Sequence, residues 1–224
     1  GPRTQTGGMS TSADQNAQLF VLDLHSMQLS ERFGQSGVLD VGEPNAFVGG
    51  LVSADYDLDA ETDAVYFGTA SQRNAANKAS GWEGKLFSLR NRGNDSFNWQ
   101  QHVLFDAKAP VIQRPNVSID SLNNRWIHFG TGMLLNQNDA LSRTQNYLFG
   151  IKEYRDNKGR FAMDNVDDST QKKTKLSQLV DVTDIVLDRE SVPFGGQVTY
   201  QAGWFKRLLP GERVSDSGRV LGGV

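Results

Sequence analysis

Two short motifs recur at a single spacing along the chain. Phe67-Gly68-Thr69 returns as Phe129-Gly130-Thr131, and Leu86-Phe87 returns as Leu148-Phe149, each 62 positions further on (129 − 67 and 148 − 86). Both motifs lie in segments that are rich in Phe, Leu, Val and Tyr, as β-strands are. Because two independent matches share one offset, they indicate a duplicated unit of strands. A chain built from such copies is predicted to be all-β.

Short apolar segments bounded by Gly, Asn, Asp and Ser predict the strands themselves, whereas helical periodicity is nearly absent. The expected strands cover residues 17–24, 47–54, 64–69, 85–90, 103–106, 125–130, 146–154, 179–188 and 197–207. A repeat of about 60 residues has room for four short strands and a loop, so we expect a partial or modified β-propeller. A β-sandwich with similar hairpins is the alternative. The glycine of Phe-Gly-Thr predicts a bulge or a close approach of backbone.

Composition divides the chain into a lead-in and one domain. Residues 1–16 are expected to be the remnant of a cleaved fusion and a flexible lead-in, because Gly1-Pro2 is typical of a protease-cleaved start. Residues 17–224 are expected to form the β-propeller domain, as a fragment of a longer protein. Within it, the polar segment 155–178 is predicted to be a mobile insertion.

Charge and cysteine content exclude several classes of protein. The net charge is −3, with 23 basic and 26 acidic residues spread along the chain, which argues against binding to nucleic acid. The chain has no cysteine, so disulfide scaffolds, thiolate zinc sites and cysteine nucleophiles are ruled out. No apolar run approaches the roughly 20 residues that span a bilayer, and no signal-peptide pattern is present, so membrane insertion is not expected.

The strongest chemical signal is an acidic loop at residues 55–63, between two predicted strands. Carboxylates occupy its positions 1, 3, 5 and 9, which are Asp55, Asp57, Asp59 and Asp63. Calcium prefers six to eight oxygen ligands, and alternating carboxylates of a curled loop can point at one ion. Without a cation these charges would repel one another. The pattern therefore predicts a Ca²⁺ site, with the backbone carbonyl of Glu61 at position 7 as a further ligand.

The loop departs from the helix-loop-helix calcium hand at two positions. Ala60 stands where glycine is usual at position 6, and Tyr66 stands at position 12 in place of a bidentate glutamate. Strands flank the loop on both sides, so we expect a strand-loop-strand site in which Asp63 supplies the closing carboxylate. A solvated acidic turn without an ion is the alternative.

The sequence resembles the C-terminal propeller domain of the PilC/PilY family of type IV pilus-associated proteins. The resemblance extends from about residue 19 to the end of the chain, and the acidic loop with its flanking strands is its most specific element. It rests on the segments 48–59, 62–69, 84–90, 126–132, 203–205 and 209–214.

The resemblance implies a quinoprotein-like β-propeller that acts in adhesion, pilus extension and retraction, and twitching motility. It implies an extracellular location at the pilus tip or outer-membrane surface, with pilins or minor pilins, and a host or abiotic surface, as partners. It also implies that the acidic loop binds calcium, through Asp55, Asp57, Asp59, Asp63 and the backbone of Glu61. An architectural, calcium-stabilised propeller of an extracellular assembly is the alternative.

An enzyme is not expected. The three histidines, His25, His102 and His128, lack the spacing of metal ligands, and no phosphate-binding loop or nucleophile elbow is present. A quinoprotein dehydrogenase shares the propeller style and the use of calcium, so it is the enzyme alternative.

Overall fold

The computed structural model describes residues 15–30, 36–72, 81–91, 99–153, 174–185 and 202–220. Antiparallel strands dominate this part of the chain, together with one short helix and one 3-10 turn at Leu176–Gln178. The strands and the helix are β1 (Gln18–Phe20), β2 (Val38–Asp40), β3 (Ala46–Ala54), β4 (Ala64–Gln72), β5 (Trp82–Glu83), β6 (Lys85–Asn91), β7 (Trp99–Asp106), β8 (Asn116–Ile119), β9 (Arg125–Gly130), α1 (Gln137–Leu141), β10 (Tyr147–Lys152), β11 (Val180–Asp181) and β12 (Gly203–Arg207).

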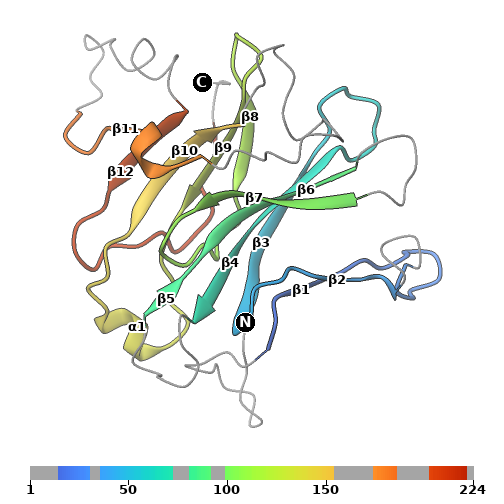
Figure 1. Cartoon of the computed structure of the whole chain (residues 1–224), viewed down its shortest axis with the longest axis horizontal. Helices are drawn as coiled ribbons and strands as arrows, with labels where there is room; N and C mark the ends of the chain where they lie inside the picture. The colour runs from blue at the N-terminus through green and yellow to red at the C-terminus, as the bar shows by residue number, and fades with distance from the viewer. Residues whose placement is uncertain are drawn as a thin grey trace.

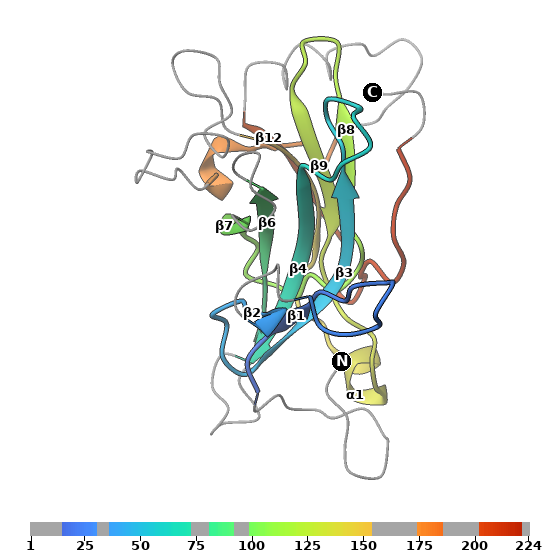
Figure 2. The same cartoon turned by 90° about the vertical axis from the view of Figure 1, so that its right-hand side faces the viewer.

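Two five-stranded sheets make up most of the fold. The first sheet has the order β3-β4-β6-β7, with β5 paired to β4, and the second sheet has the order β11-β12-β10-β9-β8. Strands β1 and β2 form a separate hairpin. Figure 1 shows the first sheet between this hairpin and the second sheet. In the turned view of Figure 2, α1 and the β8–β9 hairpin lie at opposite ends of the molecule.

The central strand pair of the first sheet, β4 and β6, recurs in the second sheet as β9 and β10, as the repeated motifs predicted. In the first sheet Phe67 pairs with Phe87, and in the second sheet Phe129 pairs with Phe149, so the shared offset preserves the register. The rings of each pair also stack, with centroids 5.4 Å and 5.0 Å apart respectively. The predicted duplication is therefore confirmed.

The glycine of each Phe-Gly-Thr motif lies where another segment crosses the sheet. A Cβ on Gly68 would meet the backbone oxygen of Val111 at 2.2 Å, and a Cβ on Gly130 would meet the side chain of Val214 at 2.1 Å. The crossing is equivalent in both copies, because the amide of Val111 donates to Thr69 O at 3.0 Å and that of Val214 donates to Thr131 O at 3.1 Å. The predicted close approach is confirmed, and it explains why no side chain fits.

The sheets stack face to face, and each has two different faces. Tyr66 and Leu86 of the first sheet lie in one buried cluster with Phe129 and Phe149 of the second sheet. The opposite face of the first sheet, with Phe67 and its neighbours, packs against Ala17, Leu19 and Val41 of the N-terminal region. The face that carries the paired phenylalanines thus points the same way in both sheets: toward the N-terminal region in the first sheet, and toward the first sheet in the second.

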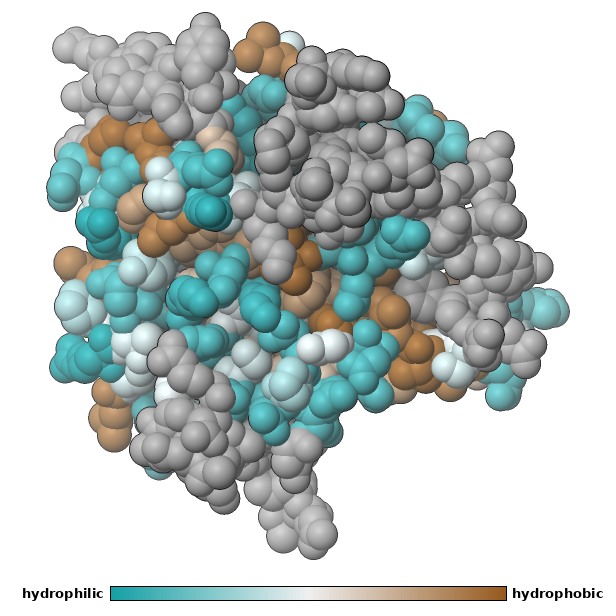
Figure 3. Space-filling view, viewed as in Figure 1, coloured by the Kyte–Doolittle hydropathy of each residue, from teal (hydrophilic) through white to brown (hydrophobic). Residues whose placement is uncertain are grey.

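On the face shown in Figure 3, hydrophilic residues predominate and hydrophobic ones are scattered between them. The large apolar side chains that are exposed near the N-terminus belong to the segment around the β1–β2 hairpin, namely Phe20, Leu22, Leu24, Met27 and Leu29.

Several predicted bounds need correction. The strand expected at 17–24 forms only over Gln18–Phe20, because beyond it the chain turns back, with Leu22 bridged to Leu29. The strands expected at 179–188 and 197–207 are described only at Val180–Asp181 and Gly203–Arg207. The sequence reading missed α1, which a capping box between Asn136 and Asp139 sets locally rather than through periodicity.

The two stacked sheets do not close into a ring within the described ranges. The expected β-propeller is therefore supported as a mostly antiparallel β fold, not as a closed propeller. Most of the predicted lead-in 1–16 and most of the predicted insertion 155–178 lie outside the described residues. No helix in the described part of the chain is long and apolar enough to cross a membrane.

Candidate metal centre

The acidic loop (residues 55–63) connects the adjacent strands β3 and β4. Ala54 and Ala64 face each other in the register of these strands, and the amide of Asp63 donates to Ala54 O at 3.0 Å. Both ends of the loop are therefore fixed by the first sheet.

Carboxylates of the loop accept hydrogen bonds from its backbone. Oδ1 of Asp55 accepts from the amide of Leu58 at 2.7 Å, and Oδ2 of the same residue accepts from the amide of Ala60 at 2.9 Å. Oδ2 of Asp63 accepts from the amide of Tyr56 at 2.6 Å. Asp side chains favour such local bonds in turns, which explains why this sequence curls here.

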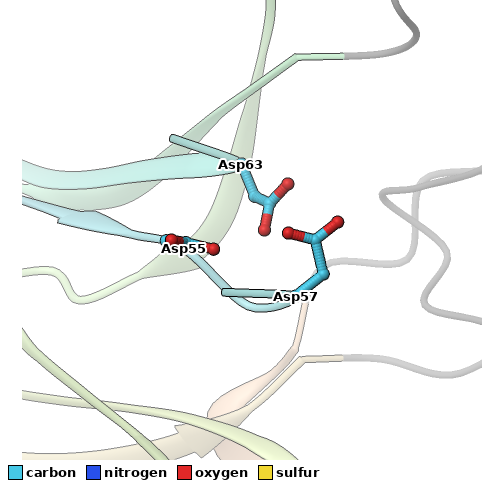
Figure 4. A group of neighbouring side chains, drawn as sticks. All are labelled: Asp55, Asp57 and Asp63. Atoms are coloured by element: carbon cyan, nitrogen blue, oxygen red, sulfur yellow. The ribbon is translucent and has the colours of Figure 1, made fainter. Parts of the chain in front are cut away.

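Three of the carboxylates converge. One oxygen from each of Asp55, Asp57 and Asp63 lies within 4.8 Å of the others. Figure 4 shows the carboxylates of Asp57 and Asp63 turned toward each other, with Asp55 beside them at the start of the loop. Calcium binds carboxylate oxygens at about 2.3–2.6 Å, so ligand oxygens around one ion lie within about 5 Å of each other. The donor set and its spacing fit a Ca²⁺ ion.

Crowding of negative charge is already visible at Asp57. Partial desolvation, together with repulsion from Asp59, Asp63 and Asp55, raises the pKa of its carboxyl above the ordinary value. A bound cation would reverse this repulsion, since an opposite charge favours the ionised form.

The predicted ligand set is only partly brought together. Asp59 is exposed and accepts from the amide of Glu61 at 2.8 Å through Oδ1, and it is not one of the three converging carboxylates. Glu61 is exposed as well. The roles of Asp59 and of the Glu61 carbonyl as ligands stay predictions. Asp55, Asp57 and Asp63 form the converging triad of carboxylates.

The position that usually holds glycine has the backbone conformation that favours glycine. Ala60 has φ of +69°, in the left-handed region, which costs an L-residue about 1–2 kcal/mol. We expect Ala60→Gly to raise the free energy of unfolding by about 0.5–1 kcal/mol, because the strain removed exceeds the added entropy of the unfolded chain. Urea unfolding measures this change.

The matched control for this substitution is Ala140→Gly. Ala140 is exposed in the helix α1, where glycine costs about 1 kcal/mol. The two substitutions should therefore act in opposite directions, and a loss of stability in Ala60→Gly would contradict the strain at this position.

A buried polar network lies beside the loop, between the two sheets. Arg90 of β6 donates through Nη2 to Oε1 of Glu153, which follows β10, and their side chains are only 2% and 0% exposed. Nη1 of Arg125 lies 3.5 Å from the other oxygen of Glu153. The hydroxyl of Tyr66 also donates to Oε1 of Glu153. The sequence reading missed this network, because Arg90 and Glu153 are 63 residues apart and share no local pattern.

Tyr56 connects the loop to this network. Its hydroxyl lies 2.7 Å from the hydroxyl of Tyr66, and the guanidinium of Arg125 lies 3.9 Å from the centroid of its ring. Burial is the main cause that raises the pKa of both tyrosines, of Tyr66 most strongly. Both hydroxyls are therefore neutral at physiological pH and available as hydrogen-bond donors.

The three histidines belong to separate elements, as expected from the sequence. His25 is exposed in the turn after β1, His102 is buried on β7, and Nε2 of His128 on β9 lies 3.1 Å from Oγ of Ser118. The converging aspartates are the one metal-ligand cluster found among the described residues.

Comparison with solved structures gives an informative match. No family model and no curated protein matches the chain. Among solved structures, the C-terminal domain of PilY1 from Pseudomonas aeruginosa matches with a TM-score of 0.56 and 14% sequence identity, over 89% of this chain and 47% of that chain. At this identity the likeness shows the fold, and at that level it confirms the expected resemblance. The chain spans about half the length of the domain it matches.

Proposed function

We propose that this chain is a calcium-binding part of a PilC/PilY-type protein of type IV pili, located at the cell surface, whose role is binding rather than catalysis. The observation that carries the proposal is the convergence of Asp55, Asp57 and Asp63 in a strand-loop-strand turn, within a fold that matches the PilY1 C-terminal domain. In this proposal the two sheets are blades of a β-propeller, and adhesion, pilus extension and retraction, and contact with pilins belong to the longer protein.

The residues of the loop would hold the ion without large rearrangement. Asp55 is fixed by the amides of Leu58 and Ala60, and Asp63 by the amide of Tyr56, while each carboxylate oxygen keeps a further lone pair for a cation. Asp57 lies opposite Asp63 and would close the site (Figure 4). A bound Ca²⁺ would supply positive charge that cancels the repulsion among these carboxylates and rigidifies the β3–β4 turn.

Calorimetric titration with Ca²⁺ tests the site. We expect one binding event in the unaltered chain, weakened about tenfold or more in Asp57→Asn, because one of three converging charges is lost. At a Ca²⁺ concentration of 100 times Kd the free energy of unfolding should rise by about 2.7 kcal/mol, and Asp57→Asn should lose about half of this gain or more.

Asp106→Asn is the matched control, because Asp106 is a partly exposed carboxylate that pairs with Lys108 outside the loop. Its Ca²⁺ affinity should equal that of the unaltered chain. Absence of Ca²⁺ binding in the unaltered chain, or equal binding in Asp57→Asn, contradicts the site. Co-purification of the full-length protein with pilins tests the assignment to pili separately, since an architectural propeller of another assembly would not retain them.

A further inference from the structure

We propose that Tyr56 is a positioning residue of the cation site and that, with Tyr66, it couples cation binding to the contact between the two sheets. The inference rests on the proposed calcium site and adds a regulatory consequence to it. The loop lies beside the network between the sheets. Its residue Tyr56 bonds both to Asp63 within the loop and to Tyr66 of the network.

Tyr56 is fixed at two ends. Its backbone amide donates to Oδ2 of Asp63, a member of the converging triad, at 2.6 Å. Its hydroxyl reaches the buried hydroxyl of Tyr66 at 2.7 Å, and its ring lies against the guanidinium of Arg125. A shift of Asp63 toward a cation therefore acts on the same residue that contacts the network between the sheets.

The number of available protons fixes which group donates in each hydrogen bond between Tyr56, Tyr66 and Glu153. A tyrosine hydroxyl has one proton, and that of Tyr66 goes to the carboxylate of Glu153. The oxygen of Tyr66 therefore accepts from Tyr56, and it also accepts from Nη2 of Arg90 at 2.5 Å. The resulting order is Tyr56 to Tyr66 to Glu153. Bonds in such a chain polarise one another, most strongly where water is excluded, and Tyr66 is fully buried.

The chain of bonds crosses from one sheet to the other. Tyr66 lies on β4 and Arg90 on β6 of the first sheet, whereas Glu153 follows β10 and Arg125 begins β9 of the second sheet. Coupling between two sites is reciprocal, so a cation that orders Tyr56 tightens the contact between the sheets, and an intact contact raises the affinity for the cation.

Calorimetric titration of Tyr56→Phe and Tyr66→Phe with Ca²⁺ tests the coupling, because neither substitution changes a charge. Each is expected to weaken Ca²⁺ binding about three- to tenfold, which is the change in affinity that corresponds to the loss of one hydrogen bond. The double variant should bind no more weakly than the weaker single variant, since both remove the same link. Tyr147→Phe, on the edge of the same buried cluster and away from the loop, should bind within about twofold of the unaltered chain.

Hydrogen exchange gives a readout that a local packing role would not change. The amide of Glu153 donates to Arg125 O at 3.0 Å in the second sheet. We expect Ca²⁺ to slow its exchange at least about threefold in the unaltered chain and not in Tyr66→Phe. The amide of Val21, which donates to Gly37 O next to the β1–β2 hairpin, serves as the internal reference.

The outcomes separate this inference from the proposed function. If the unaltered chain binds Ca²⁺ while both tyrosine variants bind it equally well, the coupling is refuted and the calcium site stands. If the unaltered chain binds no Ca²⁺, both fail. Should Tyr66→Phe not fold, Tyr56→Phe decides alone, because Tyr56 is only partly buried and phenylalanine retains its ring contact with Arg125.

Discussion

Replacing Arg90 with methionine is expected to lower the free energy of unfolding by about 3–5 kcal/mol, the cost of leaving a buried charge without its main partner. The side chains of Arg90 and Glu153 are 2% and 0% exposed, so Glu153 cannot recover water when the guanidinium is removed. Arg125 compensates only in part, because its Nη1 lies 3.5 Å from the carboxylate. Urea or guanidinium unfolding at a fixed Ca²⁺ concentration measures the loss.

Arg207→Met is the matched control, because Arg207 pairs with Asp181 at 2.7 Å while the two side chains are 52% and 36% exposed. Solvent screens this pair, so we expect a change within about 1 kcal/mol. The double variant Arg90→Met/Glu153→Leu should recover much of the stability lost in Arg90→Met, since apolar residues can replace a buried ion pair at little cost. Equal losses in Arg90→Met and Arg207→Met would contradict the importance of burial.

Gly68→Ala is expected to destabilise the chain by about 1–3 kcal/mol or more, through overpacking. The new methyl group would lie 2.2 Å from the backbone oxygen of Val111, which is itself held because its amide donates to Thr69 O. The residues on either side of Val111 are held as well, because the amide of Gly132 donates to Pro110 O and that of Gly50 donates to Ile112 O, each at 2.8 Å. This backbone segment therefore cannot move away as a free side chain can. Thermal and denaturant unfolding measure the effect.

Two further glycines calibrate this substitution. Gly130→Ala meets the side chain of Val214 rather than backbone, so its cost should be smaller than that of Gly68→Ala. Gly81 has nothing within 4 Å of an added Cβ, and Gly81→Ala should change stability by no more than about 0.5 kcal/mol. Any other order of stability loss among the three variants would show that close contact with the crossing segment does not determine the cost of adding a methyl group.

The sequence predicted the central strands well and the short elements poorly. The bounds of β9 match the expected 125–130, because Trp126 and Ile127 and a Phe-Gly-Thr end mark the strand locally. Strand β8 has only four residues, two of them polar, and its place is set by pairing with β9. Its polar-apolar alternation lasts for only four residues, the shortest run that indicates a strand. Helix α1 is also short, and its five residues depend on its cap.

In the acidic loop, too, the features that depend on neighbouring residues could be predicted, and those that depend on the folded backbone or on distant strands could not. Four aspartates at alternating positions could be found in the sequence, because neighbours in a short loop are close in space. Which of them converge depends on the backbone at Leu58 and Ala60, where φ is +63° and +69°. Neither residue type signals a left-handed conformation, so the separation of Asp59 from the other three could not be predicted. Nothing in the sequence marked Tyr56 of the loop or Tyr66 of β4 as members of the network, since Arg90, Arg125 and Glu153 come from or next to distant strands.

The direction of the stack has a consequence for how many units such a fold can hold. Tyr66 and Gly68 lie on the face that the first sheet presents to the second, and their counterparts His128 and Gly130 lie on the outer face of the second sheet. The outer face of the second sheet therefore corresponds to the face through which the first sheet contacts the second. Head-to-tail association of this sort has no internal stop, so it ends only by closing on itself or by meeting a cap. In a stack of this kind, the rotation between neighbouring units decides how many of them fit before the assembly closes.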